Sequence, residues 1–296
     1  MSRLLVIRLS ALGDVIHTIP AVVALRERHE IGWAVEPPYA ELVELVAGVR
    51  PIPVSLKQWS ARKITAARRA VRGYDTAIDF QGLVKSALLA RASGAQERIG
   101  FAPEFVREKP AAWLMNKHVQ IDPTKHVVEW NLQLAGVEKA PEVDFTKFAL
   151  STQDSGLRTV VLLPGAGRPE KIWPHFDRLA KRLGDRALAV WGPGEEALAK
   201  ATGAPMAPRT NLRELARLLR DAALVVGGDT GPLHLAAALG TRVVGLYGPT
   251  NPARNGPYGQ LGNVVESHST TKSMESIGVD EVMRRIEEVS RRDART

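Results

Sequence analysis

Asp229, Thr230, Gly231 and His234 have types and a spacing that suit the binding of an anionic ligand. The apolar run over residues 223–228 is typical of a buried strand, and an alanine-rich helix follows it. A strand that enters a helix through glycines leaves backbone N–H groups free at the positive end of the helix dipole. Phosphate binds well at such a helix start, so the segment predicts a phosphate site.

A second loop of the same kind follows the apolar run that ends at Leu163. It reads Gly165-Ala166-Gly167, and Lys171 comes just before the next helix. Glycines let a phosphate approach the backbone and lysine adds a compact positive charge. The ending of the nucleoside-triphosphate P-loop, Gly-Lys-Ser/Thr, is absent, so the loop predicts a different kind of phosphate contact.

Glu195 follows a third strand exit, Val190-Trp-Gly-Pro-Gly194. Its carboxylate could accept hydrogen bonds from ribose hydroxyls. A glutamate also favours the first turn of a helix through the helix dipole, and both interpretations stay open.

Asp14 lies in a Ser10-x-x-Gly13-Asp14 turn that follows the first apolar run of the chain. A carboxylate that projects from a strand end could act as a general base toward an alcohol. Serine and aspartate are also common helix caps, so a purely structural role is an equal alternative. We expect His17, one turn later, to pack rather than to act as the base.

Strand and helix patterns alternate along the whole chain, which is typical of two doubly wound parallel sheets. Ligands of such sheets bind beyond the carboxyl ends of the strands, where all the residues above are predicted to lie. The predicted strands cover 4–9, 31–36, 50–54, 76–80, 98–101, 159–163, 187–191, 224–226 and 243–247. The predicted helices cover 20–28, 61–72, 84–92, 127–135, 174–183, 195–201, 212–222, 232–239 and 279–292.

The predicted domains follow from this alternation. A first Rossmann-like domain covers residues 1–140, a polar linker 141–156 and a second Rossmann-like domain 157–275. The last helix, within 276–296, is amphipathic, and we expect it to pack back on the first domain.

Composition excludes several classes of protein. The 296 residues contain no cysteine, which excludes disulfides, thiolate nucleophiles and cysteine zinc sites and fits a reducing compartment. No run of 18 apolar residues is present and the N-terminus does not resemble a secretory signal, so we expect a cytoplasmic protein. Motifs for a bound metal ion are absent, so we expect neither a metal nor another cofactor.

The positive charge is concentrated in one quarter of the chain. Residues 55–125 contain 13 Lys or Arg and six Asp or Glu, an excess of seven, against a net charge of +8 for the whole chain. Such a region attracts nucleic acid, an anionic membrane or a phosphorylated substrate, or is only a solvated surface. It has few aromatic residues for base stacking and no nucleic-acid-binding motif, so we expect no nucleic-acid partner.

Five motifs together resemble the ADP-heptose:lipopolysaccharide heptosyltransferases, glycosyltransferase family 9, over nearly the whole chain. The motifs are Ser10-Ala-Leu-Gly-Asp-Val-Ile-His-Thr-Ile-Pro20, Asp79-Phe-Gln-Gly-Leu-Val-Lys-Ser86, Lys171-Ile-Trp-Pro174, Gly228-Asp-Thr-Gly-Pro-Leu-His234 and Tyr247-Gly-Pro-Thr250. The sequences of these motifs are more similar to heptosyltransferase I than to heptosyltransferase II. The resemblance implies the GT-B fold, with two Rossmann-like domains facing a cleft.

The resemblance also implies a reaction, an inverting transfer of L-glycero-D-manno-heptose from ADP-heptose to a Kdo residue of Kdo-lipid A in inner-core synthesis. Asp14 would deprotonate the acceptor hydroxyl and Lys171 would stabilise the leaving diphosphate. The implied donor-binding residues are Gly165, Ala166, Gly167, Lys171, Glu195, Asp229, Thr230, Gly231 and His234. The implied acceptor-binding residues are Ser10, Gly13, Arg62, Gln81, Lys85 and Arg107.

The implied location is the cytoplasmic face of the inner membrane, with peripheral attachment to its anionic surface. The chain departs from the heptosyltransferase I pattern in the Gly165-Ala166-Gly167 loop, where those enzymes carry threonines. A GT-B glycosyltransferase that uses another sugar nucleotide or acceptor is therefore the alternative.

Overall fold

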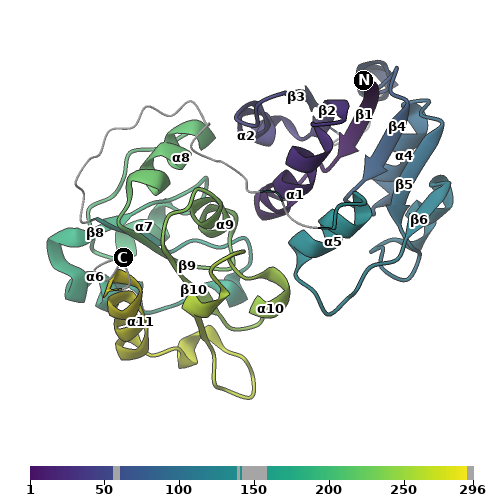
Figure 1. The fold of residues 1–296 in the computed structure, drawn as a ribbon. Helices are drawn as coiled ribbons and strands as arrows, with labels where there is room; N and C mark the ends of the chain where they lie inside the picture. Colours follow the sequence, from purple (N-terminus) through teal and green to yellow (C-terminus); the bar gives the residue numbers. More distant parts are fainter. Residues whose placement is uncertain (56–60, 139–140, 142–158, 292–296) are drawn as a thin grey trace. The chain divides into compact units, whose positions relative to one another are not determined.

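The computed structural model describes residues 1–55, 61–138, 141 and 159–291. The chain divides into two compact units, Met1–Ala149 and Leu150–Thr296, and each unit has its own sheet (Figure 1). All strand pairs in both sheets are parallel, which confirms the predicted fold class of two Rossmann-like domains. The predicted linker, 141–156, lies outside the described residues except for Pro141.

The sheet of unit 1, called sheet 1, has six strands in the order β3-β2-β1-β4-β5-β6. Its order reverses between β1 and β4, which leaves a crevice for a ligand at the carboxyl ends of these two strands. The strands are β1 (Ser2–Ile7), β2 (His29–Val35), β3 (Val49–Pro53), β4 (Thr76–Asp79), β5 (Glu97–Phe101) and β6 (Lys117–Val119).

Helices cover both faces of sheet 1, because buried parallel strands are apolar on both sides. On one face lie α1 (Leu12–Leu25) and α5 (Val127–Leu134), which pack against each other. On the other face α3 (Ala61–Ala70), α4 (Val84–Ala92) and the 3-10 helix η2 (Lys109–Leu114) share one apolar core with β1. The short helices η1 (Pro37–Tyr39) and α2 (Ala40–Glu44) follow β2.

The helix predicted over 20–28 is wrong at its start, because α1 begins at Leu12 and Pro20 lies in its interior. Proline costs the helix one backbone hydrogen bond, but the continuous buried run Val15–Val23 offsets that cost. The short elements β6 and α2, of three and five residues, have no counterpart among the predicted strands and helices.

The sheet of unit 2, called sheet 2, has the order β11-β10-β9-β7-β8. The order reverses between β7 and β9, so the ligand crevice of this sheet is expected at the carboxyl ends of these strands. The strands are β7 (Val160–Leu163), β8 (Ala187–Ala189), β9 (Leu224–Gly228), β10 (Val243–Tyr247) and β11 (Val264–Glu266).

The helices of unit 2 pack on both faces of sheet 2. Helices α6 (Phe176–Leu183) and α11 (Val279–Arg291) share one core with the strands, and α8 (Leu212–Asp221) packs against α9 (Gly231–Ala238). The remaining elements are α7 (Glu196–Ala201), α10 (Pro252–Asn255), η4 (Pro169–Lys171), η5 (Gly184–Arg186), η6 (Leu261–Asn263) and η7 (Met274–Ser276).

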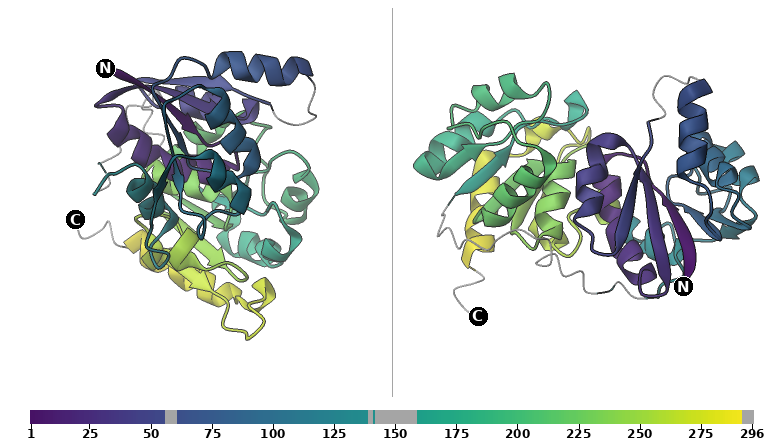
Figure 2. Two further views of the ribbon diagram at one scale, coloured as in Figure 1. Left: turned by 90° about the vertical axis from the view of Figure 1, so that its right-hand side faces the viewer. Right: turned by 90° about the horizontal axis from the view of Figure 1, so that it is seen from above.

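The position of α11 corrects the expectation that the last helix packs on the first domain. Its apolar residues Val282, Ile286 and Val289 are buried in the core of unit 2, beside α6 and β10. Figure 2 shows this yellow helix alongside the green elements of the same unit. None of the helices in the described part of the chain has the length and hydropathy that a membrane span needs.

Candidate active site

The loops that leave β7 and β9 form the candidate donor site at the order reversal of sheet 2. The β7 loop contains Gly165, Ala166, Gly167 and Lys171, and the β9 exit contains Asp229 and Thr230. A direct hydrogen bond between Lys171 and Asp229 joins the two loops. The structure therefore brings together the two phosphate-binding segments that the sequence predicted separately.

Asp229 is the centre of this site. The Lys171 Nζ atom lies 2.6 Å from Asp229 Oδ2, and the His234 Nε2 atom lies 3.0 Å from Asp229 Oδ1. Burial alone would raise the pKa of Asp229, but the hydrogen bonds and charges of His234 and Lys171 outweigh it and lower the pKa to about 2. Asp229 is thus held as a carboxylate, an acceptor for two donors or for ligand hydroxyls.

The start of α9 supplies hydrogen-bond donors beside this carboxylate. Thr230 is the N-cap of α9 and its side chain makes no capping hydrogen bond. Its Oγ1 atom is buried and has no hydrogen-bond partner, which is costly for a hydroxyl unless a ligand pairs with it. The Thr230 hydroxyl and the first-turn amides of α9 therefore suit an anionic ligand at this edge.

Glu195 lies against the β7 loop rather than away from it. Its Oε2 atom accepts a hydrogen bond from the Gly192 N–H at 2.8 Å. A Cβ atom on Gly165 would lie 2.1 Å from the Glu195 carboxyl carbon, whereas one on Gly167 would meet nothing within 4 Å. The Glu195 carboxylate therefore occupies the space that a side chain at Gly165 would need, and such a side chain would displace it.

Buried aromatic residues hold the two loops in place. The Trp173 indole N–H donates to the Ile277 carbonyl at 3.0 Å, and its ring is 1% exposed in the core of unit 2. The Tyr247 hydroxyl at the end of β10 donates to the Asn255 carbonyl at 3.1 Å. The motifs around Lys171 and Tyr247 thus include buried aromatic residues whose hydrogen bonds fix the loops to the rest of unit 2.

The carboxyl edge of sheet 1 forms the candidate acceptor site. Ser10 lies between β1 and α1, whereas Gly13 and Asp14 lie in the first turn of α1, where Asp14 is half-buried. Asp14 Oδ2 accepts the Ala11 N–H at 3.1 Å, so the carboxylate also caps the helix. The capping role considered from the sequence is thus present, and it uses one of the two carboxylate oxygens.

A buried arginine that the sequence analysis did not identify lies behind Asp14. Arg8, at the end of β1, is 8% exposed and donates to the Thr18 hydroxyl at 3.4 Å. Burial lowers the pKa of Arg8, while the charges of Asp14 and Asp79 raise it. The signal in the sequence was a single cation at the end of an apolar strand run.

The motif Asp79–Ser86 is largely structural. Asp79 is 1% exposed and accepts hydrogen bonds from the Gln81 N–H at 2.9 Å, the Gly82 N–H at 3.3 Å and the Ser86 hydroxyl at 2.8 Å. The Gln81 side chain accepts the Leu9 N–H at 2.7 Å, which joins the exits of β1 and β4. These contacts fix the edge at which a substrate would bind.

Basic residues of this edge come from several elements. Lys85 in the first turn of α4 lies 3.9 Å from the buried Glu36 carboxylate, and its side chain is 34% exposed. Arg107 is exposed on the loop after β5, next to Glu108, whose carboxylate caps α4 through the Val84 N–H. Arg62 is exposed on α3, and no contact in the structure joins it to Lys85 or Arg107.

The described residues contain no group of three or more histidine and carboxylate side chains that could hold a metal ion. The groups at the two edges are a half-buried carboxylate in unit 1 and a lysine, a carboxylate and helix amides in unit 2. Such a set suits the transfer of a group from a phosphate leaving group to an alcohol.

Comparison with known proteins agrees with this chemistry. The family model described as glycosyltransferase family 9 (heptosyltransferase) matches residues 64–278. Lipopolysaccharide heptosyltransferase 1 of Salmonella typhimurium is 34% identical over 291 residues, which cover 87% of this chain and 92% of that protein.

Two solved structures of the E. coli heptosyltransferase WaaC are also similar. The complex with ADP is 31% identical, covers 97% of this chain and 99% of the other, and has a TM-score of 0.85. The complex with ADP-2-deoxy-2-fluoro heptose has the same identity and coverage and a TM-score of 0.82. From the matched family model and these relatives, the chain belongs to glycosyltransferase family 9, the heptosyltransferases.

Proposed function

We propose that this enzyme transfers L-glycero-D-manno-heptose from ADP-heptose to a Kdo residue of Kdo-lipid A, with inversion at the anomeric carbon. The single observation that carries the proposal is the cluster of Lys171, Asp229 and His234 at the order reversal of sheet 2. This cluster combines a cation for a diphosphate with a carboxylate for sugar hydroxyls. The names and ligands of the similar proteins support ADP-heptose as the donor.

In the proposed step, a Kdo hydroxyl attacks the anomeric carbon of the heptose. Asp14 accepts the hydroxyl proton as the new C–O bond forms, and the bond between the anomeric carbon and the phosphate oxygen breaks. The electron pair of that bond leaves with ADP. A positioned carboxylate base contributes on the order of 10²–10⁴-fold to such a step.

Residues of unit 2 stabilise the leaving ADP. Lys171 and the first-turn amides of α9 offset the charge that develops on the phosphate oxygen. Asp229 accepts hydrogen bonds from heptose hydroxyls, and Glu195 accepts them from the ribose. Thr230, whose buried hydroxyl has no partner in the structure, donates to a phosphate oxygen.

Residues of unit 1 bind the acceptor. Lys85, Arg107 and Arg62 bind the Kdo carboxylate and the lipid A phosphates, and the backbone around Ser10 and Gly13 lines the same edge. Gln81 holds that edge together through its hydrogen bond to Leu9. The positive charge of unit 1 is therefore matched to an anionic glycolipid.

The proposal includes no metal ion or other cofactor, because Lys171 and the helix amides supply the positive charge at the leaving group. It places the enzyme in the cytoplasm, bound peripherally to the anionic inner membrane where the lipid acceptor is found. A chelator of divalent ions is expected to leave turnover unchanged, and a loss of turnover that added Mg²⁺ restores would contradict the metal-free step.

One observation favours a second candidate, a GT-B enzyme with a different sugar nucleotide. The loop before Lys171 carries no hydroxyl side chains, and the Glu195 carboxylate lies where a side chain at Gly165 would be. Release of the nucleotide from ADP-heptose and from uridine and guanosine diphosphate sugars, with and without Kdo-lipid A, separates the two candidates. The proposal expects release from ADP-heptose only when the acceptor is present, and turnover with a uridine donor alone would contradict it.

A further inference from the structure

One face of unit 1 combines exposed apolar side chains with an excess of positive charge. Among the described residues, only five large apolar residues are exposed, and three of them lie on this face. They are Ile64 of α3, Leu88 of α4 and Trp113 of η2, with exposed fractions of 43%, 40% and 79%. Since α3, α4 and η2 share one core against sheet 1, they form a single outer layer, which we call the α3–α4–η2 face.

The charge of this layer differs strongly from that of the opposite layer. Residues 61–72 and α4 together contain seven Lys or Arg and no Asp or Glu, whereas α1 and α5 contain no Lys or Arg. Several of the arginines are exposed and, within the described residues, form no ion pair with a carboxylate: Arg62, Arg68, Arg69, Arg72 and Arg91. Cations that are not neutralised by the protein are available to an external anion.

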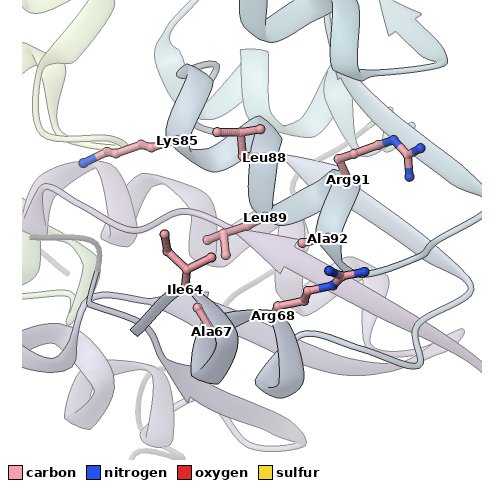
Figure 3. Close-up of a pocket in the computed structure, with 8 residues that line it drawn as sticks. All are labelled: Ile64, Ala67, Arg68, Lys85, Leu88, Leu89, Arg91 and Ala92. Atoms are coloured by element: carbon pink, nitrogen blue, oxygen red, sulfur yellow. The ribbon is translucent and has the colours of Figure 1, made fainter. Parts of the chain in front are cut away.

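A groove of about 350 Å³ runs between α3 and α4 on this face (Figure 3). Ile64 and Ala67 line it from α3, and Leu89 and Ala92 from α4. Lys85 lies at one end of the groove, and Arg68 and Arg91 lie toward the other (Figure 3). The groove is thus an apolar channel with cations at its ends.

These features match a lipid bilayer better than another partner. Insertion of apolar side chains together with lysine and arginine contacts to headgroups is how proteins bind to an anionic membrane surface. An exposed tryptophan suits the headgroup level, because its ring is apolar and its N–H is polar. Single-stranded nucleic acid would need several stacking aromatics, and Trp113 is the one exposed aromatic of the layer in the described residues.

We propose that the α3–α4–η2 face docks on a bilayer with anionic headgroups, with one lipid acyl chain in the groove between α3 and α4. This proposal rests on the proposed function, in which the acceptor is a membrane lipid. Lys85 lies both at the end of the groove and at the carboxyl edge of sheet 1 that carries Asp14. Docking on this face would therefore hold the acceptor edge next to the membrane surface.

Sedimentation of the full chain with vesicles tests the charge requirement. The probe vesicles contain phosphatidylglycerol in phosphatidylcholine, and pure phosphatidylcholine vesicles are the reference. The double variant Arg68→Gln/Arg91→Gln removes two positive charges that would contact headgroups. Its binding to the anionic vesicles is expected to be about 30-fold weaker than that of the wild type. The matched variant Arg186→Gln/Arg217→Gln removes two exposed arginines from unit 2 and is expected to bind like the wild type.

Quenching by lipids with brominated acyl chains tests the apolar insertion. Trp113 fluorescence is expected to be quenched by anionic brominated vesicles, and Trp113→Phe is expected to lose that part of the quenching. Leu261→Ser changes another exposed apolar residue, in unit 2, and should not alter vesicle binding.

Turnover on a water-soluble, deacylated Kdo acceptor separates this proposal from the proposed function. The Arg68→Gln/Arg91→Gln variant is expected to keep that turnover, which also shows that it is folded. Equal binding to anionic and neutral vesicles, or a loss of binding in both double variants alike, would overturn the docking face. Failure of the wild type to turn over the soluble acceptor with ADP-heptose would overturn the proposed function and leave the vesicle result standing.

Discussion

The Asp79→Asn variant tests whether Asp79, the most deeply buried carboxylate among the described residues of unit 1, destabilises the fold when it is ionised. Burial raises the pKa of Asp79 from 3.8 to about 6, and the hydrogen bonds from Gln81, Ser86 and Gly82 only partly oppose it. A shift of about two pKa units corresponds to about 3 kcal/mol of stability, because each unit is worth about 1.4 kcal/mol.

The sign of the effect follows from the raised pKa. The folded state binds the Asp79 proton more tightly than the unfolded state, so the wild type loses stability as pH rises from about 4 to about 6. Asparagine keeps an acceptor for the amides of Gln81 and Gly82. Its NH₂ group can donate to the Ser86 hydroxyl, whose single proton, shared in the wild type between Asp79 and the Leu83 carbonyl, is then donated to the Leu83 carbonyl alone. Asp79→Asn should therefore stabilise unit 1 by up to about 3 kcal/mol above pH 6 and by nothing below pH 4.

Native-state hydrogen exchange measures this free energy within unit 1 alone. A suitable amide is that of Phe80, which donates to the Ile7 carbonyl in sheet 1. Asp75→Asn is the matched control, since Asp75 belongs to the same unit and is exposed. A wild type whose opening free energy does not change between pH 4 and pH 7, or an Asp79→Asn variant that is less stable at pH 8, would refute the reasoning.

Three further predictions concern the donor site. Lys171→Gln should lower the rate of acceptor-dependent ADP release by about 10²–10³-fold, because the leaving diphosphate loses its cation, and unchanged release would exclude this role. Asp229→Asn should destabilise unit 2 by about 2 kcal/mol at pH 7, and this difference should vanish as pH falls from about 4 to about 2, because the folded pKa of Asp229 lies below its unfolded value. Urea unfolding at several pH values measures the difference in stability, and a difference that does not depend on pH would contradict the prediction. Gly165→Ala should displace the Glu195 carboxylate and raise the KM for the donor in the same assay, and an unchanged KM would contradict the role of Glu195 at the donor.

Much of the fold could be predicted from periodicity, because buried strands and amphipathic helices alternate with short loops. The errors lie where a local rule was outweighed by packing. Pro20 indicates a helix start by its own preference, yet the buried run around it continues the helix on both sides. The amphipathic pattern of α11 shows that one face is buried but contains no information on which core it joins.

The donor cluster could be predicted in part for a different reason. Lys171 and Asp229 both follow strands of one parallel sheet, and strand ends of that kind meet at one edge. Their direct contact depends on the neighbouring positions of β7 and β9, which the sequence alone does not specify. Glu195 was correctly placed at a strand exit, but its approach to Gly165 depends on the tertiary fold.

The buried charges of unit 1 were the least predictable part of the site. Arg8, Glu36 and Asp79 are polar residues at strand ends, and such residues are mostly exposed. Their burial results from the packing of several elements around one edge, which no local pattern encodes. These buried charges adjoin the candidate acceptor edge, because Arg8 lies behind Asp14 and Glu36 pairs with Lys85.

The central claim is that a base in unit 1 takes the proton of the acceptor hydroxyl, which attacks a donor held in unit 2, and Asp14→Asn tests it most directly. The measurement is acceptor-dependent ADP release by this variant, together with its affinity for ADP-heptose. The account predicts that release falls by about 10²–10⁴-fold while the affinity for ADP-heptose stays at the wild-type value. Release at nearly the wild-type rate would contradict the account, because Asp14 could then not be the base.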